Sequence, residues 1–312
     1  MEKQKMKIYV KTPARLHFGL IDMNGDMGRF FGGLGVGIDQ PNVILEAQHT
    51  ERFTVTGEKV ELVTSFAKKF LETYNINTKV SIHLKESIPE HEGLGSGTQL
   101  ALAVATALAR LFNVKATTKE LSLVMGRMKR TGVGTTIFEQ GGFVVDGGKT
   151  LKEGVVIPNS LPPIIFHQPC PKDWKFVVAV PDAKKGLTKN VEKTAFDRLP
   201  QMPAEVVGKI CWLTMMKLLP SLVDCDIENF GDALTKIQVA VGDFFAGVQG
   251  GTFSSSVASR VIDFMKNHGA YGVGQSSWGP ATYGLVKGEI KAMNLKSEVE
   301  SFLQANQGGL VF

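Results

Sequence analysis

The sequence has only three cysteines, and this scarcity argues against two kinds of protein. Cys170, Cys211 and Cys225 are odd in number and form no Cys-x-x-Cys pair. A disulfide framework needs cysteines in even number, and structural zinc sites commonly use Cys-x-x-Cys pairs. We therefore expect neither feature, and the cysteine usage favours a reducing, cytoplasmic location.

Long hydrophobic runs and dense basic blocks are also missing. The longest apolar stretch, residues 100–112, is interrupted by Arg110. It is shorter than the roughly 20 residues that a membrane span needs, and the charged N-terminus does not resemble a signal peptide. The net charge of +5 is spread over short runs. This mild excess suits small anionic substrates, and we expect neither a membrane nor a nucleic acid as a partner.

Hydrophobic spacing predicts strands and helices in both halves of the chain. Apolar positions alternate in residues 7–18 and 78–87, as in strands, whereas residues 59–75 and 227–248 have helical spacing. This mixture predicts an α+β fold. Five prolines fall within residues 158–174, a concentration that is typical of a boundary between domains. We therefore predict two domains, residues 1–165 and residues 166–312.

A glycine-rich turn leads into the most apolar helix of the sequence. Ser96 stands where an N-cap belongs and Gln99 follows three residues later, a pattern that predicts a capping box. The glycines let the backbone approach a ligand closely, and a helix N-terminus attracts anions. The spacing matches neither a Walker A loop nor a dinucleotide fingerprint. The alternative is a tight turn without a ligand. The residues predicted to bind phosphate are Gly93, Leu94, Gly95, Ser96, Gly97 and Thr98.

Three segments together resemble the GHMP kinase superfamily. They are TPARLHFGLIDMNG (12–25), PEHEGLGS (89–96) and GVGQSSWGPATYGLV (272–286). The resemblance implies a GHMP-kinase-like two-domain fold, with an N-terminal α/β domain that carries the phosphate loop and a ferredoxin-like C-terminal domain. It also implies a homodimer.

One segment departs from the kinase pattern. Kinases of this superfamily that resemble mevalonate kinase carry Ser-Gly-Val-Asp ahead of a Gly-Gly strand, and the Asp accepts the hydroxyl proton during phosphoryl transfer. Here Thr131-Gly132-Val133 is followed by Gly134, and Gly97 replaces a serine that helps to hold magnesium. The sequence therefore predicts a phosphate pocket without the kinase base.

The same segments, with RFFGGLGVGID (29–39) and RTGVGTTIFEQGGFVVDGG (130–148), resemble most closely the β-ribofuranosylaminobenzene 5′-phosphate synthases. This resemblance implies a pentosyltransferase of methanopterin biosynthesis. It would join 4-aminobenzoate or 4-hydroxybenzoate to phosphoribosyl pyrophosphate, with Mg²⁺, and release carbon dioxide and pyrophosphate. The alternatives are an ATP-dependent small-molecule kinase and a non-catalytic protein that binds a phosphate ligand.

Candidate catalytic residues lie in the first segment, and each also has a structural interpretation. The fork of Arg15 suits a carboxylate or a phosphate, and in an extended chain His17 points the same way. Asp22 could hold magnesium, a ribose hydroxyl or the oxocarbenium charge, or it could simply form a turn. Glu92 is a candidate magnesium ligand. The residues predicted to bind substrate are Arg29, Gln275, Ser276, Ser277 and Trp278, and one of Lys184, Lys185 and Lys189 could meet phosphate.

Overall fold

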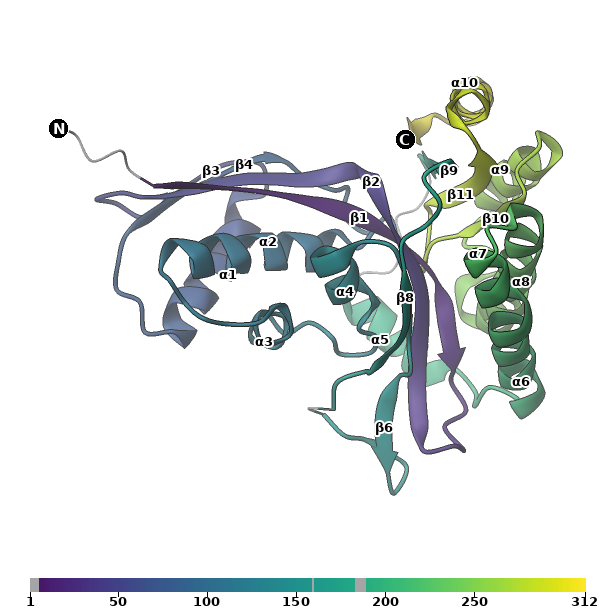
Figure 1. Cartoon of the computed structure of the whole chain (residues 1–312), viewed down its shortest axis with the longest axis horizontal. Coiled ribbons are helices and arrows are strands. Elements are labelled where there is room, and N and C mark those ends of the chain that lie inside the picture. Colours follow the sequence, from purple (N-terminus) through teal and green to yellow (C-terminus); the bar gives the residue numbers. More distant parts are fainter. Residues whose placement is uncertain (1–5, 159, 183–188) are drawn as a thin grey trace.

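The computed structural model describes residues 6–158, 160–182 and 189–312, and it confirms the α+β fold. A long antiparallel hairpin dominates the first sheet (Figure 1). Its strands are β1 (Lys7–Asp22) and β2 (Arg29–His49). Ala14, Leu16 and Phe18 alternate along β1 and are fully buried, as the period of two predicts.

Strand β2 is the centre of the first sheet, since it pairs with β1, β4, β5 and β6. Glycine in β2 lets a helix approach closely: a Cβ at Gly35 would lie 2.6 Å from Cγ1 of Val133. The other strands of this sheet are β3 (Thr54–Gly57), β4 (Val80–Glu86), β5 (Phe143–Asp146), β6 (Lys149–Lys152), β7 (Val155–Val156) and β8 (Ile164–Gln168).

The helix after the glycine turn, α2 (Ser96–Leu111), is buried on nearly all sides, as its composition predicts. It packs against the β1–β2 hairpin and is flanked by the other helices of this half (Figure 1). These are α1 (Val60–Thr73), α3 (Thr118–Val124) and α4 (Val133–Gln140). Its N-terminus points toward the second half of the chain (Figure 1).

The second half contains a four-stranded sheet with the order β10-β11-β9-β12. Its strands are β9 (Trp174–Pro181), β10 (Gly272–Gln275), β11 (Thr282–Lys287) and β12 (Gly309–Val311). The helices of this half are α5 (Lys189–Arg198), α6 (Ala204–Leu213), α7 (Leu219–Val223), α8 (Ile227–Gln249), α9 (Ser256–Asn267) and α10 (Glu289–Asn306).

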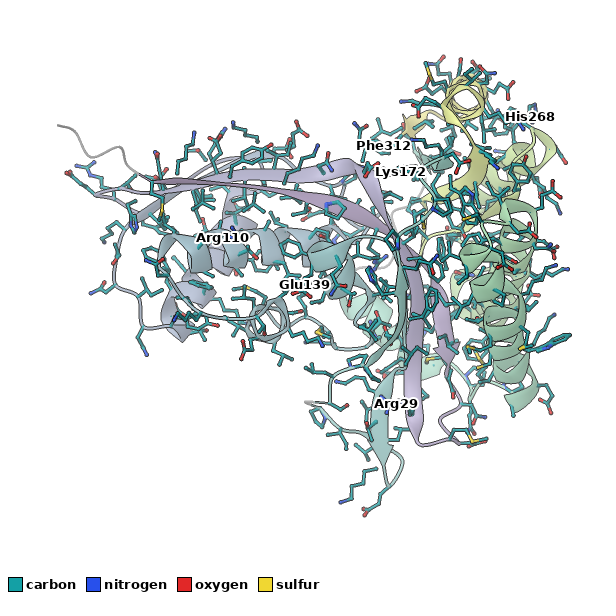
Figure 2. All side chains as sticks on the ribbon, in the orientation of Figure 1. Arg29, Arg110, Glu139, Lys172, His268 and Phe312 are labelled. Atoms are coloured by element: carbon teal, nitrogen blue, oxygen red, sulfur yellow. The ribbon has the colours of Figure 1, made fainter. Side chains whose placement is uncertain are left out.

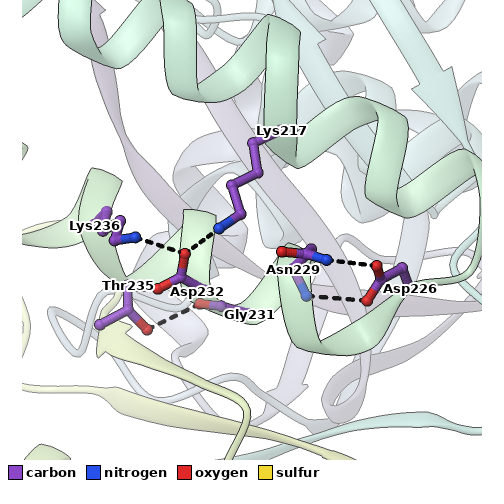
Figure 3. A network of polar contacts seen from close by, with 7 residues as sticks. All are labelled: Lys217, Asp226, Asn229, Gly231, Asp232, Thr235 and Lys236. Atoms are coloured by element: carbon purple, nitrogen blue, oxygen red, sulfur yellow. Dashed lines mark hydrogen bonds and ion pairs between the residues drawn. The ribbon is translucent and has the colours of Figure 1, made fainter.

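One long helix of the second half is continuous from Ala204 to Val223, because a π-helical turn (Thr214–Leu218) joins α6 to α7. Lys217 of this turn forms an ion pair with Asp232 of α8, and Lys236 reaches the same carboxylate at 2.7 Å (Figure 3). Among the described residues, this helix alone has the length and hydropathy to cross a membrane. One of its faces packs on α8.

The proline-rich segment lies where the chain passes from one sheet to the other. Strand β8 still pairs with β5 of the first sheet, and β9 begins the second sheet at Trp174. The boundary between residues 165 and 166 that the sequence predicts therefore falls inside β8. A continuous apolar core joins the first sheet to the helices α6 and α8.

Candidate active site

The first predicted segment and the glycine-rich loop meet at Arg15. The backbone N–H of Arg15 donates to the carbonyl oxygen of Leu94 at 3.1 Å, and its Nη1 donates to that of Gly93 at 2.9 Å. The side chain also packs on the loop, since a Cβ at Gly95 would lie 2.7 Å from Cγ of Arg15. Strand β1 thus holds the guanidinium directly against the predicted phosphate site.

The third segment closes the same site through Ser276 and Ser277. The hydroxyl of Ser276 donates to the carbonyl oxygen of Gly93 at 2.7 Å and accepts from the backbone N–H of His17 at 2.9 Å. The backbone N–H of Ser277 donates to the carbonyl oxygen of His17 at 2.9 Å. The structure therefore brings together parts of all three segments that the sequence singles out.

The N-terminus of α2 differs from the predicted capping box. The N-cap is Gly95, in a left-handed conformation with φ of 78°, and Ser96 is already the first helical residue. In the described part of the chain, no acceptor faces the backbone N–H groups of Ser96 and Gly97. The loop remains partly exposed. The helix therefore presents free donors to the solvent side, as an anion site requires.

The position that lacks the kinase carboxylate faces this loop. A Cβ at Gly134 would lie 3.4 Å from Cγ2 and 3.9 Å from Oγ1 of Thr98. Gly134 stands in the first turn of α4, and its carbonyl oxygen accepts from Nε2 of Gln99 at 3.0 Å. An acidic side chain at residue 134 would thus point toward the phosphate loop, whereas glycine leaves that space without charge.

His17 is held in its neutral form. Burial, together with the positive charge of Arg15, lowers the pKa of the imidazole well below its ordinary value. Its Nδ1 accepts from the backbone N–H of Gly19 at 3.3 Å, which assigns the proton to Nε2. His17 can therefore donate one hydrogen bond to a ligand at neutral pH, but it adds no charge.

A second arginine, Arg127, lies beside the loop, and no motif in the sequence marks it as a site residue. A Cβ at Gly97 would lie 3.3 Å from Nη1 of Arg127, and the guanidinium lies 5.3 Å from the ring centroid of Phe66. Burial lowers the pKa of Arg127, and among the described residues its buried Nε has no hydrogen-bond acceptor. Arg15 and Arg127 thus flank the loop at Gly95 and Gly97.

A cavity of about 140 Å³ lies beside Arg15, between the two halves of the chain. Predicted site residues Arg15, His17, Ser277 and Trp278 line part of it. The complete lining is Arg15, His17, Gly19, Leu20, Arg130, Thr131, Phe196, Val241, Phe245, Ser277 and Trp278.

Asp22 and Arg29 are predicted from the sequence to bind substrate or metal, and neither borders this cavity. Oδ1 of Asp22 accepts from the backbone N–H groups of Asn24 at 2.7 Å and Gly25 at 2.9 Å, which is the turn-forming interpretation. Arg29 lies at the start of β2, beside β6 (Figure 2), and its guanidinium donates to the carbonyl oxygens of Gly147 and Gly148.

Gln275 and Glu92 are both buried and do not border the cavity. Oε1 of Gln275 accepts from the backbone N–H of Ser254 at 2.7 Å, and its Nε2 donates to the carbonyl oxygen of Ser277 at 3.0 Å. Gln275 therefore supports the loop of the third segment. Glu92 is 8% exposed, directly before the phosphate loop. The side chains of Lys184, Lys185 and Lys189 lie outside the described part of the structure.

A buried carboxylate fixes the backbone next to Gly134. Asp146, at the end of β5, accepts from the backbone N–H of Gly132 at 2.8 Å and from that of Gly148 at 2.9 Å. It has no exposed surface, and burial raises the pKa of its carboxyl from 3.8 to about 6. Asp146 acts on the site through the backbone of residues 131–134, and the sequence does not distinguish it from an ordinary turn aspartate.

Comparison with known proteins defines the class of this fold. Residues 61–143 match the GHMP kinases N terminal domain. The chain resembles the crystal structure of Leishmania major mevalonate kinase, with a TM-score of 0.71 at 13% identity, over 100% of this chain and 96% of the other. It also resembles homoserine kinase from Cytophaga hutchinsonii, with a TM-score of 0.65 at 19% identity, over 100% and 95% of the two chains. The fold is that of the GHMP kinases.

Two relatives define the family more closely. A β-ribofuranosylphenol 5′-phosphate synthase of Methanothermobacter thermautotrophicus is 31% identical, over 89% of this chain and 88% of its own length. One from Archaeoglobus fulgidus is 37% identical, over 73% and 74%. The chain belongs to the β-ribofuranosylphenol 5′-phosphate synthase family. The names of these relatives specify a phenol, whereas the resemblance in the sequence motifs pointed to the aminobenzene product.

Proposed function

We propose that this protein is a decarboxylating pentosyltransferase of methanopterin biosynthesis. It joins 4-hydroxybenzoate to phosphoribosyl pyrophosphate, and the phenol in the names of its relatives favours this acid over 4-aminobenzoate. The observation that carries the proposal is the position of Arg15. Its side chain contacts the phosphate loop at Gly93 and also lines the cavity, so one group borders both proposed substrate sites.

The reaction breaks and forms bonds at one ribose carbon. The C1–O bond breaks and its electron pair leaves with pyrophosphate, which gives C1 oxocarbenium character. The ring carbon that bears the carboxylate then attacks C1 and forms a carbon–carbon bond. The bond to the carboxylate breaks, carbon dioxide leaves, and the electron pair of that bond restores the aromatic ring.

The loop and the two arginines stabilise the leaving group in this proposal. Negative charge accumulates on pyrophosphate as the C1–O bond breaks, and donors that are already in place stabilise it without reorganisation. The backbone N–H groups of Ser96 and Gly97 supply such donors, and Arg15 and Arg127 supply charge on either side. Neutral His17 donates from Nε2. Roles for Asp22 and Arg29 in substrate contact stay predictions.

Magnesium is part of the proposal, and Glu92 is the residue that fits it best. Mg²⁺ at phosphate sites usually takes one or two protein carboxylates, with substrate phosphates and water as its other ligands. A buried carboxylate directly before the phosphate loop matches that arrangement, and Thr98 is the loop hydroxyl that replaces the missing serine. When bound, the ion would neutralise charge on the departing pyrophosphate.

The partner of this protein in solution is proposed to be a second copy of itself. The face of the helix Ala204–Val223 that points away from α8 exposes Trp212 to 69%, Met215 to 56% and Met216 to 69%. No charged residue occurs between Lys209 and Lys217. Contiguous apolar side chains of this kind mark protein interfaces, and a two-fold axis through this stretch would bury the same residues on both copies. A cytoplasmic location is proposed with it.

The release of carbon dioxide tests the proposed function. Carboxyl-labelled 4-hydroxybenzoate is incubated with the full-length protein, magnesium and phosphoribosyl pyrophosphate, and a parallel reaction contains ATP in place of the phosphoribosyl donor. We expect labelled carbon dioxide in the first reaction alone. If neither reaction releases labelled carbon dioxide and 4-aminobenzoate is equally inert, the proposal is excluded. ATP consumption with an alcohol would support the kinase alternative.

A further inference from the structure

We propose that the cavity beside Arg15 is the pocket for the ring of an aromatic carboxylate, with Phe196, Phe245 and Trp278 as its walls. The identity of the ligand in this pocket rests on the proposed function. Of its three aromatic residues, only Trp278 is a candidate from the sequence alone. The other two come from helices α5 and α8, which are distant in sequence from the three motif segments.

The three rings hold one another in place. The centroids of Phe245 and Trp278 are 5.0 Å apart at an interplanar angle of 80°, and those of Phe196 and Trp278 are 5.5 Å apart at 87°. Phe196 and Phe245 complete the set at 6.1 Å and 84°. Such edge-to-face contacts are the favoured geometry of aromatic pairs. The wall is therefore a preformed surface that can bind another ring without rearrangement.

The size of the cavity matches a single ring. Its volume is about 140 Å³, and an apolar cavity of about 150 Å³ in another protein binds benzene. A phosphorylated ribose has no apolar face that would replace water on such a wall. The pocket therefore selects the aromatic substrate, and the ribose and its phosphates are left to the loop.

The charge of the lining selects an anionic ring. Two arginines, Arg15 and Arg130, border the cavity, and the described lining contains neither aspartate nor glutamate. The guanidinium carbon of Arg130 lies 4.0 Å from the ring centroid of Phe196, in a cation–π contact that holds it over the aromatic wall. The ring of an aromatic carboxylate complements the apolar surface, and its carboxylate complements the positive charge.

The position of Arg15 orients the ring. Because Arg15 is bonded to Gly93 of the phosphate loop, the end of the cavity that it borders lies nearest the ribose. The ring carbon that attacks C1 is the one that bears the carboxylate, so the carboxylate must point to this end. Arg15 therefore contacts the carboxylate of the substrate. Arg130, whose guanidinium lies over the ring of Phe196, is a specificity residue for the substrate ring.

Two substitutions and two readouts test this pocket. Phe245→Leu keeps the site apolar but removes a ring, and Arg130→Gln removes the charge. We expect each to raise the KM for 4-hydroxybenzoate by about 10-fold while the KM for phosphoribosyl pyrophosphate changes by less than about two-fold. Phe264→Leu in α9, whose ring stacks on Phe302 and His268, is the matched control and should change neither.

Ligand binding without turnover separates this inference from the proposed function. Titration of 4-hydroxybenzoate without phosphoribosyl pyrophosphate should quench the fluorescence of Trp278 in a background in which both other tryptophans are replaced, Trp174→Phe and Trp212→Phe. Phe245→Leu in the same background should weaken this binding by about 10-fold. If the wild type shows that quenching but forms no product, the pocket stands and the proposed reaction fails. If Phe245→Leu binds the acid as the wild type does, or raises both KM values equally, the pocket is overturned.

Discussion

Gln99 donates a hydrogen bond from Nε2 to the carbonyl oxygen of Gly134 at 3.0 Å, and this bond ties the first turn of α2 to the first turn of α4. The phosphate loop and the segment that carries the base in related kinases are therefore in direct contact. The scaffold of a phosphoryl-transfer site is retained, but residue 134 has no side chain. The change of chemistry that we propose requires that residue 134 carries no carboxylate.

Gly134→Asp should inactivate the synthase. A carboxylate at residue 134 would face Thr98 and repel the pyrophosphate in the loop, and we expect kcat/KM for phosphoribosyl pyrophosphate to fall by about 100-fold. The matched control is Gly134→Ala, whose Cβ would meet Thr98 only at ordinary contact distance. In a helix this change should keep activity and add about 0.5 kcal/mol of stability. Full activity of Gly134→Asp in steady-state assays would contradict this account of the loop.

Gly93→Ala should separate the loops of the second and third segments. Gly93 has φ of 85°, and a Cβ there would lie 2.2 Å from the carbonyl oxygen of Ser276. Strain of this kind costs about 1–3 kcal/mol, so the free energy of unfolding should fall by that amount in urea titrations. Gly208→Ala, in an exposed turn of α6 with no atom within 4 Å, should not destabilise the protein. Equal stability of the two variants would show that the loops do not need this contact.

Asp146 predicts a pH dependence of stability with a definite sign. Its pKa is raised to about 6 in the fold from 3.8, so the native state binds the proton more tightly than the unfolded chain does. The favourable contribution of the protonated form is complete below pH 3.8 and is lost as the pH rises to about 6. That change is worth about 3 kcal/mol.

Unfolding by urea at a series of pH values measures this effect. The wild type should lose about 3 kcal/mol relative to Asp146→Asn between about pH 4 and pH 6, since the amide does not titrate. A constant difference between the two proteins over this range would show that Asp146 has an ordinary pKa.

Met216→Lys should disrupt the proposed dimer. Met216 is 69% exposed at the centre of the apolar face of the helix Ala204–Val223. Two lysines that meet across a two-fold axis repel each other and lose water, so we expect the variant to sediment as a monomer. Met293→Lys on α10, a methionine that is 63% exposed, is the control and should sediment as a dimer. A dimer with both variants would place the interface elsewhere.

Much of the fold and part of the site could be predicted from local sequence. The apolar helix after the glycine turn agrees with the prediction, because it depends on a motif of a few residues. That the third segment lies against the loop follows from the resemblance to the GHMP kinases and not from local spacing. The capping box at Ser96 is wrong, since a left-handed glycine takes the N-cap position and glycine adopts that conformation at no steric cost.

The remaining site residues depend on contacts between distant elements. Phe196 and Phe245 come from helices whose apolar spacing is equally consistent with an ordinary core. Only the tertiary structure brings their rings into contact and places both beside Arg15 in the cavity lining. The burial of Arg127 and Asp146 could not be predicted either, because a short basic run and a turn aspartate are usually solvated. The burial of Arg127 beside Gly97 and that of Asp146 beside Gly132 are tertiary properties.

The bond that the protein forms is the most direct test of the account. Phosphoribosyl pyrophosphate with carbon-13 at ribose C1 and 4-hydroxybenzoate with carbon-13 at the carboxylate-bearing ring carbon are incubated with the wild type and magnesium. The product is then examined by carbon-13 NMR. We expect one-bond coupling between the two labelled carbons, which requires a carbon–carbon bond in place of the lost carboxylate. A product in which the labelled carbons show no one-bond coupling, such as an ester that retains the carboxyl carbon, would contradict the account.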